Sequence, residues 1–94
     1  MFVRVVTLNS KEGKEEEVRQ LGRNMLVPIN KKAGCVDVHF LEPTTANDSS
    51  FGVISMWEDQ QALNEMKESD GYCTLIQQMQ PLLKSVTDCV YWTD

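Results

Sequence analysis

The stretch from Phe51 to Met66 changes from strand periodicity to helix periodicity within a few residues, and it constrains the fold more than any other segment. Its first half, FGVISMW, is apolar and typical of a β-strand. Asp59 then stands where a carboxylate can cap the first free amides of a helix, and apolar residues follow at helical spacing. Trp57 is therefore predicted to lie where the chain passes from a sheet to a helix, at the rim of a layered core.

The rest of the chain shows either the alternation of a strand or the 3.6-residue period of a helix. Strands are predicted over Phe2–Leu8, Cys35–Glu42, Phe51–Glu58 and Val86–Trp92. Helical stripes are predicted around Val18–Ile29, Ala62–Met66 and Tyr72–Leu83. The order strand, helix, strand, strand, helix, strand predicts an α+β fold of the ferredoxin-like βαββαβ type, with a four-stranded antiparallel sheet and helices on one face. We expect a single domain over residues 1–94.

Two prolines fall inside the predicted helices. Pro28 removes a backbone donor and should kink or end the first helix in its last turn. Pro81 should distort the last turns of the final helix. Between the second and third strands, Pro43–Ser50 is a polar connection that is long for a hairpin.

Apolar residues occur on both faces of the predicted strands. On the first strand Phe2, Val6 and Leu8 share a face with Arg4, while Val3 and Val5 lie on the other. Helices can cover only one face of such a sheet, and an uncovered face should be polar. A second copy of the chain, packed on this face by two-fold symmetry, would supply the missing layer, so we expect a homodimer that completes a dimeric α+β barrel.

Composition excludes several classes of protein. The net charge is −5 and the basic residues are scattered, whereas nucleic-acid binding depends on clustered Lys and Arg. No apolar run approaches the roughly 18 residues of a membrane span. Cys35, Cys73 and Cys89 are an odd set without CxxC spacing, which favours a reducing cytoplasm over a disulfide framework. One His and scattered carboxylates give no metal-ligand spacing, and no glycine-rich phosphate loop is present, so we expect neither a metal nor a cofactor.

Two aromatic residues are candidates for binding a small molecule. Trp57 could form a pocket wall that stacks on a flat ligand, or it could plug the end of the core. Tyr72 lies at core spacing on a predicted helix, where it could pack inside or present its hydroxyl to a ligand. The sequence leaves both alternatives open.

Three polar residues lie within the predicted strands. Histidine is the side chain whose ordinary pKa is nearest to neutral, and His39 shares a strand face with Asp37, which could orient it as a general base. Same-face neighbours along one strand are roughly 7 Å apart, too far for a sure direct hydrogen bond, so a solvated or interfacial histidine stays open. Arg4 is mid-strand, and we expect it to pair with Asp37 or Asp88 across the sheet or to bind an anion.

Several segments of the chain resemble the antibiotic biosynthesis monooxygenase family, which belongs to the dimeric α+β barrel superfamily. They are FVRVV at the first strand, KEGKEEEV at the first helix start, AGCVDVHFLE on the second strand and VISMWEDQQAL at Trp57. The resemblance covers roughly Phe2 to Val86. It implies a dimer with a ligand pocket between the sheet and the helices of each subunit. Members include oxygenases that turn phenolic aromatics into quinones without metal or flavin, haem-degrading enzymes and isomerases.

The match to each branch is partial. Quinone-forming members carry an Asn four residues before the strand-ending Trp and a Tyr six residues after it, where this chain has Val53 and Leu63. Haem-degrading members use a Trp on the following helix, where Met66 stands, and a His on the last helix, where this chain has none. Haem degradation is therefore disfavoured.

The resemblance implies a cofactor-independent monooxygenase acting on a small aromatic or carbonyl-bearing molecule. In that mechanism His39 with Asp37 ionises the substrate, while Trp57, Tyr72 and Arg4 bind it. A non-enzymatic ligand-binding or regulatory dimer and an isomerase-type enzyme are the alternatives.

Overall fold

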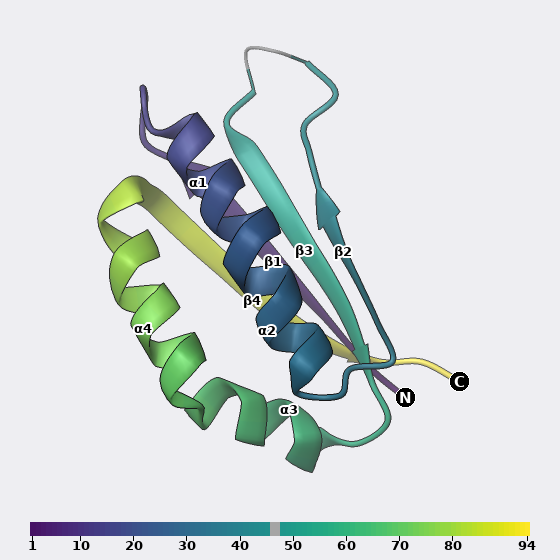
Figure 1. Cartoon of the computed structure of the whole chain (residues 1–94). Helices are drawn as coiled ribbons and strands as arrows, with labels where there is room; N and C mark the ends of the chain where they lie inside the picture. The colour runs from purple at the N-terminus through teal and green to yellow at the C-terminus, as the bar shows by residue number, and fades with distance from the viewer. Residues whose placement is uncertain (46–47) are drawn as a thin grey trace.

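The computed structural model describes residues 1–45 and 48–94 and contains one four-stranded antiparallel sheet with helices on one side (Figure 1). The strands are β1 Phe2–Ser10, β2 Asp37–Leu41, β3 Ser50–Trp57 and β4 Leu83–Trp92, in the spatial order β2-β3-β1-β4. The helices are α1 Glu15–Leu21, α2 Val27–Lys32, α3 Gln60–Glu68 and α4 Asp70–Met79. This confirms the predicted α+β ferredoxin-like fold.

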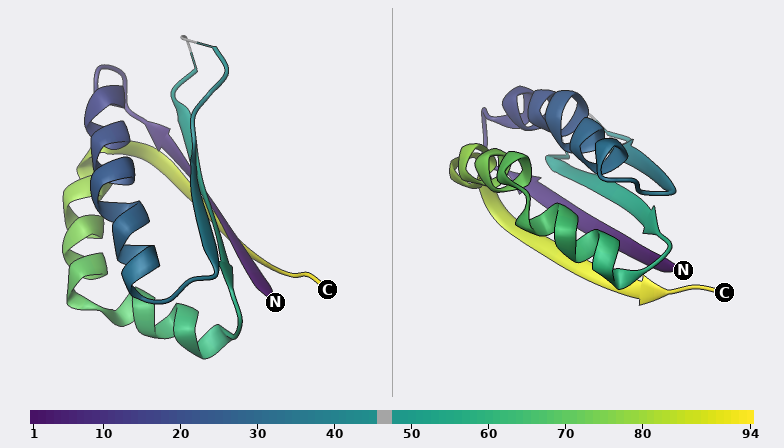
Figure 2. Two further views of the ribbon diagram at one scale, coloured as in Figure 1. Left: turned by 45° about the vertical axis from the view of Figure 1, so that its right-hand side comes forward. Right: turned by 60° about the horizontal axis from the view of Figure 1, so that its bottom comes forward.

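The sheet separates a covered face from a bare one. All the helices lie on the same side of the sheet, as Figure 2 shows from two directions. Burial alternates along β1 and β3 accordingly: Val6, Leu8 and Val53 point into the helix layer and are buried, whereas Val5 and Ile54 on the bare face are half-exposed. The predicted division of strand residues between two faces is confirmed.

The strand register brings apolar side chains together on this bare face. Val5 of β1 is paired with Ile54 of β3 on one side and with Cys89 of β4 on the other, and Ile54 is paired with His39 of β2. The next row contains Met56 and Val3 in the same way. We call this surface, which includes Val3, Val5, Ile54, Met56 and Cys89, the open face.

The first helical segment continues past Pro28 instead of ending there. A π-helical turn over Gly22–Leu26 joins α1 to α2, and the Val27 amide donates to the Gly22 carbonyl five residues earlier. Proline has no backbone N–H to donate, and a π turn beside it changes which carbonyl groups need a donor. The distortion that the sequence predicted is therefore taken up by this turn, and the helical backbone extends to Lys32.

Gly22 brings this helical segment close to the sheet. It is buried, and a Cβ added there would stand only 2.2 Å from Cε1 of Phe40 on β2. The Phe40 ring in turn stacks on Phe51 with centroids 5.8 Å apart. The π turn and the two rings thus pack directly against each other, and any side chain at position 22 must displace Phe40.

Gly22→Ala should lower the free energy of unfolding by about 1–2 kcal/mol, because overpacking against Phe40 exceeds the gain in helix propensity. Gly71→Ala is the matched control: its Cβ would meet only Ile29, at 3.9 Å, so it should be neutral or stabilise by up to about 1 kcal/mol. Urea unfolding of both variants measures the difference. Equal effects of the two substitutions would contradict the close contact.

Capping side chains set the boundaries of the second pair of helices. Asp59 caps α3 as predicted, and its carboxylate accepts from the Ala62 amide at 2.8 Å. Ser69 ends α3 and caps α4, with its hydroxyl accepting from the Tyr72 amide. Pro81 lies in a single 3₁₀ turn over Gln80–Leu82, which lets β4 begin earlier than the sequence predicted.

Ala46 and Asn47 of the predicted connection Pro43–Ser50 lie outside the described residues. Among the residues that are described, no helix is long and apolar enough to cross a membrane.

Candidate functional site

A buried arginine is the centre of a polar cluster between the sheet and the helices. Arg4 is only 5% exposed. Its Nε donates to Oδ1 of Asp88 at 3.0 Å, and its Nη2 donates both to Oδ2 of Asp88 at 2.8 Å and to the Tyr72 hydroxyl at 2.9 Å. The cluster thus joins β1, β4 and α4 in the layer where the family resemblance implies a ligand pocket.

Strand register and helix capping together place these three side chains. Asp88 is paired with Val6, two residues beyond Arg4, so both charged groups point from adjacent strands into the helix layer. Because Ser69 caps α4, Tyr72 stands in the first turn of that helix. The Arg4 guanidinium carbon lies 5.6 Å from the centroid of the Tyr72 ring, within the range of a cation–π interaction.

Electrostatics keeps the cluster charged. The hydrogen bond from Arg4 is the main reason that the pKa of Asp88 lies below its ordinary value, and nearby Lys67, with Nζ 3.8 Å from Oδ2, adds to the effect. Burial by itself would lower the pKa of Arg4, but the hydrogen bonds to Asp88 and Tyr72 outweigh it and the pKa is raised. Asp88 is therefore a carboxylate at neutral pH and a poor general acid.

Acidification should remove the contribution of Asp88 to stability. The folded protein binds this proton less readily than the unfolded chain, whose carboxyl has a pKa near the ordinary 3.8, so the contribution is complete well above that value and lost as pH falls through the lower folded pKa. The gap in melting temperature between wild type and Asp88→Asn should therefore narrow from about pH 5 to pH 3. A gap that stays constant over this interval would contradict the pairing.

Trp57 adjoins the cluster but is sealed in the core. The side chain is 0% exposed, and its Nε1 donates to Ser55 Oγ at 2.9 Å. Ser55 is paired with Arg4 across β1 and β3, so the two polar groups are neighbours on the covered face. The indole packs with the buried Leu63 and Met66. Of the two roles that the sequence left open, this packing favours the core plug, since no face of the ring is free for a ligand to stack on.

His39 and Asp37 lie on the other side of the sheet. Both are exposed on β2, and His39 Nε2 is 2.9 Å from Asp37 Oδ2, so the direct hydrogen bond that strand spacing made doubtful does form. His39 is paired with Ile54, whereas Trp57 and Arg4 point to the helices. The structure thus separates the predicted base from the predicted binding residues by the thickness of the sheet. It also pairs Arg4 with Asp88, whereas Asp37 is on the opposite face of the sheet from Arg4.

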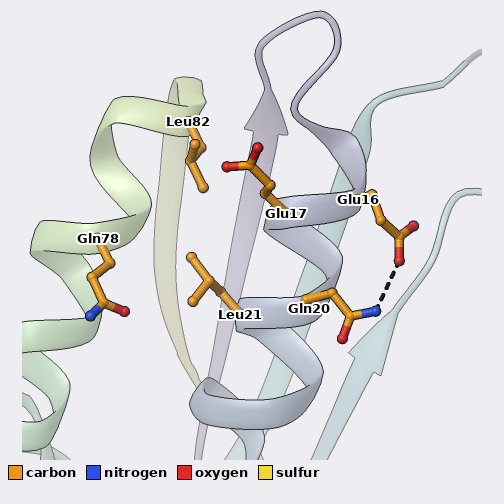
Figure 3. Close-up of a pocket in the computed structure, with 6 residues that line it drawn as sticks. All are labelled: Glu16, Glu17, Gln20, Leu21, Gln78 and Leu82. Carbon is orange, nitrogen blue, oxygen red and sulfur yellow. Dashed lines mark hydrogen bonds between the residues drawn. The ribbon is translucent and has the colours of Figure 1, made fainter.

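Two of the clefts among the described residues open on the helix layer, and neither is lined by the cluster. The larger, about 420 Å³, lies between α1 and α4, with Leu21 and Leu82 facing each other and polar side chains around them (Figure 3). The smaller, about 310 Å³, lies between the end of α2 and the start of α4. The Lys11 amide donates to the Leu82 carbonyl, so the larger cleft is near the end of β1, away from Arg4.

Lys67 and Ser55 were not recognised from the sequence, and Asp88 was named only as a possible partner of Arg4. A lysine near the end of a helix and a serine in a strand carry no signal of their own. An aspartate in the middle of β4 is the pattern that indicates a charged partner nearby. In residues 1–45 and 48–94, no three His, Cys, Asp or Glu side chains come close enough to hold a metal ion.

Comparisons with known proteins agree on the fold. A solved structure named antibiotic biosynthesis monooxygenase is 18% identical, with a TM-score of 0.87 and coverage of 100% of this chain and 99% of that one. A suggested antibiotic biosynthesis monooxygenase from Nitrosomonas europaea is 18% identical, with a TM-score of 0.87 and coverage of 99% and 98%. A conserved protein from Methanosarcina mazei is 21% identical, with a TM-score of 0.84 and coverage of 100% and 94%.

No curated protein matches the sequence. The sequence profile of one family, described as antibiotic biosynthesis monooxygenase, matches residues 1–78, which is most of the chain and includes Arg4, Trp57 and Tyr72. The chain therefore belongs to the antibiotic biosynthesis monooxygenase family.

Proposed function

We propose that the protein is a monooxygenase-like enzyme that acts without a cofactor on a small aromatic or carbonyl-bearing molecule, with Arg4 and Tyr72 as the binding residues. The observation that carries the proposal is the buried Arg4 guanidinium held against the Tyr72 hydroxyl at 2.9 Å. Because that hydroxyl oxygen accepts from Arg4, its own hydrogen is left to donate to a ligand. Family membership supports the reaction class.

These two donors suit a substrate that becomes an anion. A phenol or an activated methylene beside a carbonyl gives a phenolate or enolate on losing a proton, and preorganised donors stabilise the negative oxygen as it forms. The electron-rich carbon then reacts directly with O₂. In an anthrone-type substrate the CH₂ becomes C=O with one oxygen atom, and the second oxygen leaves as water with both of the hydrogens.

The group that removes the substrate proton in this proposal is water, and not His39 as the sequence predicted. His39 and Asp37 face away from Arg4, so they cannot reach a ligand on the covered face of the same subunit. We infer that donation from Arg4 and Tyr72 makes the substrate acidic enough for water to take the proton. His39 and Asp37 are then residues at the margin of the open face.

We also propose that the protein is a homodimer joined through the open face. That face carries Val3, Val5, Ile54 and Met56 in adjacent paired rows, and no helix covers it. An apolar surface of this kind on a sheet is usually buried by another layer. A second copy related by two-fold symmetry supplies that layer with the same residues.

Oxygen uptake with anthrone in chelator-treated buffer tests the enzymatic proposal. Wild type should consume oxygen above the uncatalysed rate, and Tyr72→Phe should lower kcat/KM about 10²-fold because one donor to the developing oxyanion is lost. His39→Ala should retain the wild-type rate, since this residue lies on the other face. The proposal fails if wild type shows no uptake, or if His39→Ala loses as much activity as Tyr72→Phe.

The cleft between α1 and α4 favours one second candidate, a non-enzymatic ligand-binding or regulatory module. Its volume of about 420 Å³ is in the size range of small-molecule pockets, and Leu21 with Leu82 offers an apolar floor. Under this alternative a small molecule would bind near Leu21 without consuming oxygen. Replacing Leu21 with Ser would then weaken binding, while Tyr72→Phe would leave it unchanged.

A further inference from the structure

Two cations converge on a single carboxylate at the edge of the Arg4 cluster. Arg4 Nη2 lies 2.8 Å, and Lys67 Nζ 3.8 Å, from the same oxygen, Oδ2 of Asp88. The formal charges of these three groups leave one net positive charge, in a chain whose total charge is −5. Both Lys67 and Asp88 have side chains that are 35% exposed, so this positive region is open to solvent on one side.

An uncovered apolar surface lies directly beside these charges. Val90 of β4 is paired with Arg4 and points to the same side of the sheet, yet it is 43% exposed. Trp92 follows on that side, and its ring meets Phe2 edge to face with centroids 5.0 Å apart. On the adjacent β1, Arg4, Val6 and Leu8 of this face are buried, so the helices cover this part of β1 and leave β4 open. A net positive charge and an exposed apolar surface thus lie side by side.

We propose that Lys67 is a specificity-determining residue that selects aromatic carboxylates as the substrate class of this site, with the carboxylate near Lys67 and the ring against Val90. The proposal rests on the proposed function in placing the ligand at the Arg4 cluster. A carboxylate would neutralise the net positive charge left over by Asp88, through a charge-assisted contact that a neutral phenol cannot make. Lys67 has no closer ion-pair partner among the described residues, so its ammonium is available.

Calorimetric titration with 1-hydroxy-2-naphthoate and 1-naphthol tests this assignment, because the two probes share the rings and the hydroxyl and differ in the carboxylate. The titrations are done in oxygen-free buffer, where binding is measured without turnover. Wild type should bind the carboxylate about 10-fold more tightly than the naphthol. Lys67→Gln should remove that preference and leave naphthol binding unchanged, and Lys67→Arg should retain it.

Lys11→Gln is the matched control, since it removes the same charge at the end of β1 that is far from Arg4. At physiological ionic strength, salt screens interactions between exposed charges beyond roughly 8 Å, so Lys11 should not affect a ligand near Arg4. The assignment is overturned if Lys11→Gln reduces carboxylate affinity as much as Lys67→Gln does, or if wild type binds both probes equally. Carboxylate preference without oxygen uptake would contradict the proposed enzyme activity and leave this assignment intact. Oxygen uptake from anthrone without a preference for the carboxylate probe would support the proposed enzyme activity and contradict the role assigned to Lys67.

Discussion

Replacing Ile54 with Asp should raise the dissociation constant of the proposed homodimer about 10³-fold. Ile54 is central in the open face, between Val5 and His39 in the paired rows. An unpaired carboxylate buried there costs about 2 kcal/mol, and two-fold symmetry introduces it twice, for about 4 kcal/mol in all. Sedimentation equilibrium over a range of protein concentrations measures the constant.

Gln77→Glu is the control for the added negative charge. Gln77 is exposed on α4, in the layer on the opposite side of the sheet, so this variant should associate like wild type. Circular dichroism on the same samples shows whether each variant remains folded. An Ile54→Asp protein that self-associates as strongly as wild type would mean that the open face is not the interface.

Asp88→Ala should destabilise the protein more than Arg4→Met does. Removing the carboxylate leaves a guanidinium that is 5% exposed with only Tyr72 as a partner, and the loss should be about 2–3 kcal/mol. This is below the cost at a fully buried pair because the Asp88 side chain is 35% exposed and solvent screens it. Arg4→Met leaves a partly exposed carboxylate near Lys67 and should cost only about 1 kcal/mol.

The double variant Arg4→Met with Asp88→Ala tests whether the unpaired Arg4 charge causes the loss of stability. Because the second substitution removes the stranded charge, the double variant should be more stable than Asp88→Ala alone. Urea midpoints at one protein concentration, with unchanged slopes, report the differences in unfolding free energy. Equal losses from the two single variants, or additive losses in the double variant, would contradict a buried ion pair.

Most of the fold could be predicted because local patterns decide it. Period-two alternation placed Val5 and Val6 on opposite faces of the first strand, and Val53 and Ile54 on opposite faces of the third, as the structure has them. The capping role of Asp59 was predictable from its residue type and its position before the helix. The path of the chain through Pro28 was not predictable, since the π turn depends on how closely Gly22 can approach Phe40, a contact between distant segments.

The site was harder to predict because it depends on register between strands. Alternation showed that His39 and Asp37 share a face, and separately that Trp57 and Val53 do. Only the pairing of His39 with Ile54 relates the faces of these two strands, and it places His39 and Trp57 on opposite faces of the sheet. Lys67 was not predicted for a similar reason. Its ion pair with Asp88 joins α3 to β4, and the direction of the chain after α3 depends on Ser69, which caps α4.

We propose that the face of the sheet toward the helices binds the ligand and that the open face binds a second copy of the chain. Nuclear magnetic resonance with 1-hydroxy-2-naphthoate tests it directly, because side chains of the same strands report on each face. The Arg4 Nε–H and the Trp57 indole N–H should shift on titration, while the methyl groups of Ile54 and Met56 should not. Shifts confined to Ile54, Met56 and the His39 ring would contradict the account.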